Sequence, residues 1–166
     1  MRFATIGVDP GTKATGLALI DDRSGLIAAS VIEWEPGTDT RLHVAEILDT
    51  IAAYAIMAVN EGGFESLRIA VEDVVRPSPH LGIIDPTHVI ELARLIGWLS
   101  AELDRYCNTE AAGWTLVRPG GHGSKPLITY PAALVGPTET TGTSGFRRHA
   151  RSAYDIARHA LTGVPA

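Results

Sequence analysis

The sequence lacks the residues and runs that define several large classes of protein. It has one cysteine, Cys107, which excludes an internal disulfide framework and a cysteine-rich zinc site. Asp9, Gly11 and Lys13 interrupt residues 1–20, so the pattern of a secretory signal is missing. No stretch reaches the ~18 uninterrupted apolar residues of a membrane span. These absences predict a soluble, cytoplasmic protein that has no membrane partner.

An excess of basic charge is also missing. The net charge is −5 over 166 residues, which argues against a nucleic-acid-binding protein of the usual basic kind. The charge is unevenly distributed, however. Residues 1–113 carry 8 basic and 17 acidic residues, a net of −9, whereas residues 114–166 carry 6 basic and 2 acidic residues, a net of +4. The basic C-terminal third can still form one basic face on an acidic body.

The length and the apolar content of 45% predict one domain over residues 1–166 with a proper core. Short apolar runs separated by turn residues predict strands, and apolar residues at spacings of three and four predict helices. The expected order is strands at 2–9, 15–21 and 26–34, a helix to about 60, a strand at 67–71, a helix at 85–107, a strand at 114–117 and a helix at 146–161. This order predicts an α/β fold with a mixed five-stranded sheet flanked by helices.

Three acidic residues occupy positions where a metal site would need them. Asp9 ends the first strand, Glu72 ends the fourth, and Asp155 lies on the last helix. A strand reached through a helix usually returns parallel to its predecessor, so we expect Asp9 and Glu72 to lie side by side. Three carboxylates at one point repel unless a divalent cation binds them, and their oxygens suit two Mg²⁺ or Mn²⁺ ions. Each acid also has a plain alternative: an ordinary turn for Asp9, a strand end for Glu72, and an ion pair with Arg151 or Arg158 for Asp155.

The residues around these acids resemble a known family. The segments 7–16 (GVDPGTKATG), 69–74 (IAVEDV) and 152–157 (SAYDIA) are similar to the motifs of RuvC-type Holliday-junction resolvases. The resemblance implies an RNase H-like fold, a homodimer and metal-dependent nicking of branched DNA such as a four-way junction. It implies that Asp9, Glu72 and Asp155 are the catalytic, metal-binding residues.

The sequence departs from the family pattern at two places. The family usually has an acid or a histidine three residues before the final aspartate, where this chain has Ser152, so Ser152 or His149 is a further candidate metal ligand. The family often has an aromatic residue three positions after the second acid, where this chain has Val75. Lys125 resembles in its placement a basic residue that meets the scissile phosphate.

Basic residues near the motifs are candidates for contact with the DNA backbone. Arginines at the start of the last helix can clamp phosphates without reading sequence, although a solvated helix start is the alternative. His80 is a second choice, and we expect structural roles for His122 and His159. The predicted DNA-binding residues are Lys13, Arg76, Lys125, Arg147, Arg148 and Arg151.

Two rival functions remain open on the sequence. One is a YqgF-like nuclease of the same fold that acts on RNA, because that group has a similar first motif and size. The other is a non-catalytic protein that binds branched DNA, which the replacement at Ser152 favours and the presence of all three acids opposes.

Overall fold

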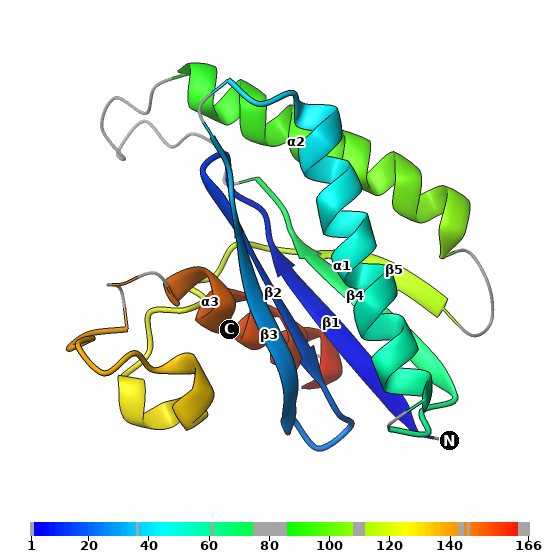
Figure 1. The fold of residues 1–166 in the computed structure, drawn as a ribbon, viewed down its shortest axis with the longest axis vertical. Helices are drawn as coiled ribbons and strands as arrows, with labels where there is room; N and C mark the ends of the chain where they lie inside the picture. Colours follow the sequence, from blue (N-terminus) through cyan, green and yellow to red (C-terminus); the bar gives the residue numbers. More distant parts are fainter. Residues whose placement is uncertain are drawn as a thin grey trace.

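The computed structural model describes residues 2–35, 37–60, 62–74, 86–107, 112–142, 145 and 147–162. A five-stranded sheet in the order β3-β2-β1-β4-β5 forms its centre (Figure 1). The strands β3, β2 and β1 are antiparallel, and β1, β4 and β5 are parallel. Their bounds are β1 Phe3–Asp9, β2 Ala14–Ile20, β3 Leu26–Glu33, β4 Ser66–Glu72 and β5 Ala112–Val117. The predicted mixed five-stranded sheet is confirmed.

The central strand β1 sets the position of the two strand-end acids. Both β1 and β2 are buried along their whole length after the first residue, because layers of helix cover both faces of the sheet. The parallel pairing of β1 with β4 runs to Val8 opposite Val71. The next residue of each strand is acidic, so Asp9 and Glu72 emerge together at one edge of the sheet.

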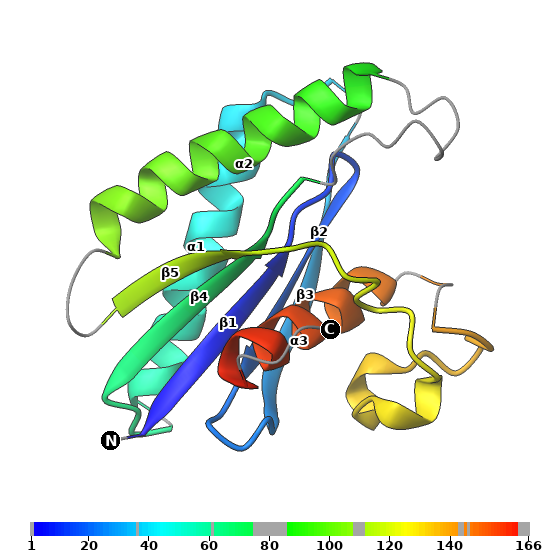
Figure 2. The same cartoon turned by 180° about the vertical axis from the view of Figure 1, so that it is seen from behind.

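Helices form a layer on each face of this sheet. Helices α1 (Thr40–Asn60) and α2 (Pro86–Tyr106) cover one face, and α3 (Arg148–Thr162) crosses the other (Figures 1 and 2). One apolar core lies under α1 and α2, and a second lies between α3 and strand β2. The chain between β5 and α3 contains two short 3₁₀ helices at Leu127–Thr129 and Ala132–Leu134. On its face α3 packs against the sheet on one side and against the segment between β5 and α3 on the other, which buries residues 150–157 of the helix.

Helix α1 buries a different face from the one that apolar spacing predicts. Apolar residues at spacings of three and four in the sequence predict a stripe formed by Leu42, Ala45, Leu48, Ala52, Ala55, Ile56 and Val59. Three of them, Leu42, Ile56 and Val59, are 61%, 61% and 62% exposed. The helix instead buries residues such as Ile47 and Tyr54 against the sheet. Apolar residues lie all round α1, so their spacing could not select the buried side. By length and composition alone, α1 is long and apolar enough to cross a membrane, but core helices of soluble proteins meet the same criterion. In this structure α1 packs on the sheet.

Two glycines bring α3 into direct contact with the backbone of the sheet. A Cβ atom on Gly7 would overlap the carbonyl of Ala153, and one on Gly16 would overlap the carbonyl of His149. From the sequence alone, a glycine at the place of Gly16 in a strand predicts either a close approach of a ligand or a β-bulge. Gly16 pairs regularly with Asp9 and Val31, and what it admits is the first turn of α3.

We expect Gly7→Ala to lower the free energy of unfolding by about 3 kcal/mol, because the new methyl group must push a helix backbone away from a strand. Gly113→Ala is the matched control, since Gly113 also lies in a strand and a Cβ there meets open space. Urea unfolding of the two variants beside the native chain measures the difference. Equal stability of the two variants would contradict the close packing of α3.

Candidate active site at the ends of strands β1 and β4

Asp9 and Glu72 meet at the edge of the sheet, as the sequence predicts. Their side chains are 13% and 19% exposed, so water reaches them from one side only. Burial of the carboxyl group raises the pKa of Glu72, and the adjacent Asp9 raises it further through its charge and a hydrogen bond. Two carboxyl groups this close favour either a shared proton or a bound cation. This pair is the centre of the candidate site.

A histidine contacts each of these two acids. Nδ1 of His149, in the first turn of α3, lies 2.8 Å from Oδ2 of Asp9. Nδ1 of His122, in the loop after β5, lies 2.6 Å from Oε1 of Glu72 and opposes the upward shift of the Glu72 pKa. The sequence predicts only a structural role for His122, because its contact with Glu72 depends on the path of an irregular loop. A histidine that holds a carboxylate in this way fixes its orientation.

Asp155 lies on α3 and is bound by three donors from the loop after β5. Its Oδ2 accepts hydrogen bonds from the Tyr130 hydroxyl at 2.7 Å and from the Gly123 amide at 3.0 Å. Its Oδ1 accepts one from Nζ of Lys125 at 3.1 Å. Burial makes the largest contribution to the raised pKa of Tyr130, and the neighbouring Asp155 carboxylate raises it further. The phenol therefore stays protonated and donates its hydrogen bond to Asp155. Lys125 is thus found beside one of the three predicted acids.

The carboxyl oxygens of Asp9 and Glu72 are of the kind that Mg²⁺ prefers. Among the described residues, no group of three or more His, Cys, Asp or Glu side chains converges on one point. Asp9 and Glu72 nevertheless fit a single Mg²⁺, because this ion is commonly held by one or two carboxylates together with water and substrate phosphate. Of the two further ligands considered, His149 contacts Asp9, whereas Ser152 is buried with its backbone against Gly123.

The predicted DNA-binding residues differ in their exposure to solvent and in the hydrogen bonds that they already make. Lys13 and Arg148 are exposed, and Lys125 is half-exposed. The guanidinium of Arg147 donates to the carbonyls of Ala133 and Val135, at 2.8 and 3.1 Å. Arg76, His80 and Val75 lie outside the described residues.

The prediction that Arg151 contacts DNA is contradicted by the structure, because its side chain is completely buried. Its guanidinium lies 2.6 Å from Oε2 of Glu139 and also donates to the carbonyls of Leu134 and Gly142. Burial alone would raise the pKa of Glu139, but the Gly136 amide and Arg151 outweigh it and lower this pKa. Arg151 therefore anchors the loop before α3 and cannot clamp a phosphate from this position.

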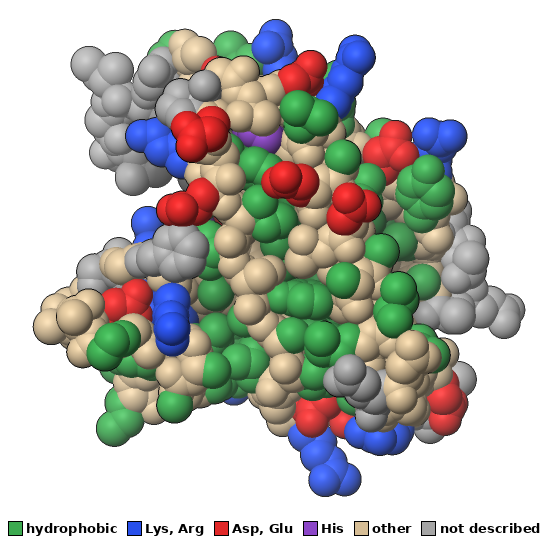
Figure 3. All heavy atoms as spheres, viewed as in Figure 1, with side chains coloured by type: hydrophobic (Ala, Val, Ile, Leu, Met, Phe, Trp, Pro, Cys, Tyr) green, Lys and Arg blue, Asp and Glu red, His purple; other side chains and the backbone are tan. Residues whose placement is uncertain are grey.

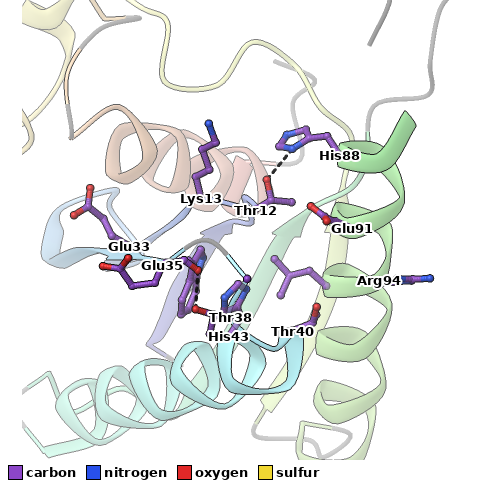
Figure 4. A pocket seen from close by; sticks show the side chains of 13 residues that line it. Thr12, Lys13, Glu33, Glu35, Thr38, Thr40, His43, His88, Glu91 and Arg94 are labelled. Atoms are coloured by element: carbon purple, nitrogen blue, oxygen red, sulfur yellow. Dashed lines mark hydrogen bonds between the residues drawn. The ribbon is translucent and has the colours of Figure 1, made fainter. Parts of the chain in front are cut away.

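A pocket of about 770 Å³ lies beside the turn that follows Asp9 (Figure 4). Thr12 closes one side of it through a 2.8 Å hydrogen bond to Nδ1 of His88. Lys13 lines the pocket, but its side chain extends away from Glu35 and His43 (Figure 4). The charged residues that line it are Glu33, Glu35, Glu91, Lys13 and Arg94. Because acids outnumber bases, we do not place a DNA phosphate in this pocket.

Comparison with known proteins gives the class of the fold. No family model matches the sequence, and no curated protein matches it. Among solved structures, the chain is similar to a Thermus thermophilus RuvC in complex with a Holliday junction substrate. That likeness covers 97% of this chain and 94% of the other, with 15% identity and a TM-score of 0.54. The chain has the RNase H-like fold of that structure.

Two further structures resemble the chain more loosely. A second Thermus thermophilus RuvC structure is 14% identical over 96% of this chain and 95% of the other, with a TM-score of 0.46. A member of the Ppx/GppA family from Aquifex aeolicus is 16% identical over 74% of this chain and 37% of the other, with a TM-score of 0.40.

Proposed function

We propose that this protein is a metal-dependent endonuclease of the RNase H-like fold that cleaves branched DNA, with the four-way junction as the preferred substrate. The observation that carries the proposal is the contact between the carboxyl groups of Asp9 and Glu72 at one edge of the sheet. Such a pair can hold a divalent ion between protein and phosphate oxygens. The chemistry requires no nucleophilic side chain, because water is the nucleophile.

The branched substrate rests on a likeness of fold and on charge. The RuvC structure that this chain resembles is bound to a Holliday junction. The residues that follow β5 carry a net charge of +4 on a chain whose net charge is −5. They supply Lys125 beside Asp155, and Arg148 next to His149, which contacts Asp9. Seen from the α1 side, hydrophobic side chains are scattered over the middle of the molecule with acidic ones above them, and most basic ones lie toward its margin (Figure 3). We therefore place DNA on the side of α3.

The side chains of the site have separable tasks in this proposal. A bound divalent ion would activate a water molecule and stabilise the charge on the leaving oxygen. His122 holds the Glu72 carboxylate and His149 holds that of Asp9, so both keep one orientation. The Lys125 ammonium, 51% exposed at the side-chain level, can reach a phosphate oxygen while it remains beside Asp155.

A homodimer is part of the proposal, because cleavage of a four-way junction by paired nicks needs two sites. The exposed apolar residues of the outer helix layer provide a surface for it. Leu42, Ile56 and Val59 lie on α1, and Ile90 and Trp98 lie on α2. Apolar side chains gathered on one face commonly mark contact with another protein.

The test is cleavage of a labelled four-way junction in Mg²⁺ and in Mn²⁺, beside duplex, forked DNA and an RNA–DNA hybrid. We expect paired nicks in the junction that require metal and that fall by about a thousandfold in Asp9→Asn. Preferred cleavage of RNA or of the hybrid would establish the RNA nuclease instead. Tight junction binding by both proteins, with no substrate cut, would establish a non-catalytic binding protein.

A further inference from the structure

Asp155 has little capacity left for a metal ion. Its side chain is 1% exposed, and both carboxylate oxygens already accept hydrogen bonds. Oδ2 accepts two hydrogen bonds, from the Tyr130 hydroxyl and the Gly123 amide. Oδ1 accepts one hydrogen bond from the Lys125 ammonium. An ion could reach this carboxylate only after the Lys125 ammonium had left it.

One loop joins Asp155 to the rest of the site. His122 contacts Glu72, and the next residue, Gly123, donates its amide to Asp155. Two residues further on, Lys125 pairs with the same carboxylate. Consecutive residues thus hold acids from β4 and from α3, and Asp155 in turn fixes the loop that carries Lys125.

The charges of this arrangement balance with a single ion. Asp9, Glu72 and Asp155 bring three negative charges, which one divalent ion and the Lys125 ammonium neutralise. A second divalent ion on Asp155 would have to displace the Lys125 ammonium, which the structure holds 3.1 Å from Oδ1 of Asp155. The sequence led us to expect two ions, whereas the arrangement of donors fits one.

We propose that Asp155 is a positioning residue for Lys125 and not a metal ligand, so that the site takes one divalent ion on Asp9 and Glu72 while Lys125 supplies the other positive charge. This inference rests on the proposed metal-dependent function. In this assignment Asp155 holds the Lys125 ammonium in place, and the ammonium stabilises the charge that develops as the phosphodiester breaks.

The experiment counts Mn²⁺ ions per chain by isothermal titration calorimetry, on the native protein and on Glu72→Gln, Asp155→Asn and Lys125→Met. We expect one ion in the native chain, none in Glu72→Gln, and one ion in Asp155→Asn with a Kd within about threefold of native. Two ions per native chain, or the loss of an ion in Asp155→Asn, would overturn the inference. A native chain that cuts junctions with two ions bound would leave the proposed function intact, whereas a chain that binds no Mn²⁺ would overturn both.

Lys125→Met keeps the proposal testable if Asp155→Asn does not fold, because the Lys125 side chain is half-exposed. We expect Lys125→Met to keep the single Mn²⁺ and its junction affinity and to lower kcat by about a hundredfold. Arg105→Met, on the exposed end of α2, is the control and should match the native chain. A native kcat in Lys125→Met, or a change confined to KM, would contradict the assigned role.

Discussion

We expect Glu72→Gln to lower the rate at which a four-way junction is cleaved by about a thousandfold, while the protein stays folded. The amide keeps the size of the side chain and can still accept a hydrogen bond from His122, 2.6 Å from the native carboxylate. It removes the negative charge that binds a divalent ion together with Asp9. The loss should therefore appear in kcat at saturating junction and should persist at high Mg²⁺ concentration.

Asp73→Asn is the matched control for this experiment. Asp73 follows Glu72 directly, but it is exposed, and its Oδ1 accepts a hydrogen bond from the amide of Val74 at 2.7 Å. Neighbouring residues at a strand end point to opposite sides. We expect Asp73→Asn to cleave within about twofold of the native rate, since surface changes away from a site have little effect. Comparable losses in the two variants would show that Glu72 acts through general charge and not as a ligand.

Arg151→Met is expected to lower the free energy of unfolding by about 3–5 kcal/mol, the usual result of breaking a buried ion pair. The side chains of Arg151 and Glu139 are 0% and 7% exposed, so the substitution leaves the Glu139 carboxylate buried without its partner. The same carboxylate accepts hydrogen bonds from the amides of Gly136 and Arg147. We therefore expect the loop before α3 to loosen as well.

A double-mutant cycle isolates this pair. Arg151→Met with Glu139→Gln removes both charges, and we expect it to be more stable than the sum of the single changes by about 2 kcal/mol. Arg148→Met, at the exposed neighbouring position, should change stability by under about 0.5 kcal/mol and should weaken junction binding. A stable Arg151→Met protein that binds DNA poorly would contradict the structural role and restore Arg151 as a DNA contact.

The fold and the central pair of acids could be predicted because local patterns determine them. Apolar runs that end at turn residues locate the strands, and the helix between β3 and β4 requires β4 to return parallel to the strand at its side. The Asp9 and Glu72 positions follow from that pairing. The predicted buried stripe of α1 was wrong because a helix that is apolar on every side carries no directional signal.

The contacts made by the loop after β5 could not be predicted in the same way. His122, Lys125 and Tyr130 reach Glu72 or Asp155 from an irregular segment with no periodicity to place them. Arg151 did carry a usable signal, because it lies four residues before Asp155 and thus on the same helix face, which is buried. An arginine on that face needs an acidic partner, and Glu139 is the single acidic residue between Val117 and Asp155.

The two faces of the sheet differ in how well they tolerate amino-acid substitutions, because the backbone of α3 contacts the sheet backbone directly at Gly7 and Gly16. On the α1 and α2 side, long side chains separate helix from strand, so substitutions can be absorbed by small shifts of either helix. On the α3 side the helix backbone lies directly on the strand backbone at these two glycines, so a shift of α3 cannot absorb a larger residue there. The α1 and α2 layer can therefore diverge in sequence and acquire new protein partners. The arrangement of residues at the ends of β1 and β4 is not altered by such changes.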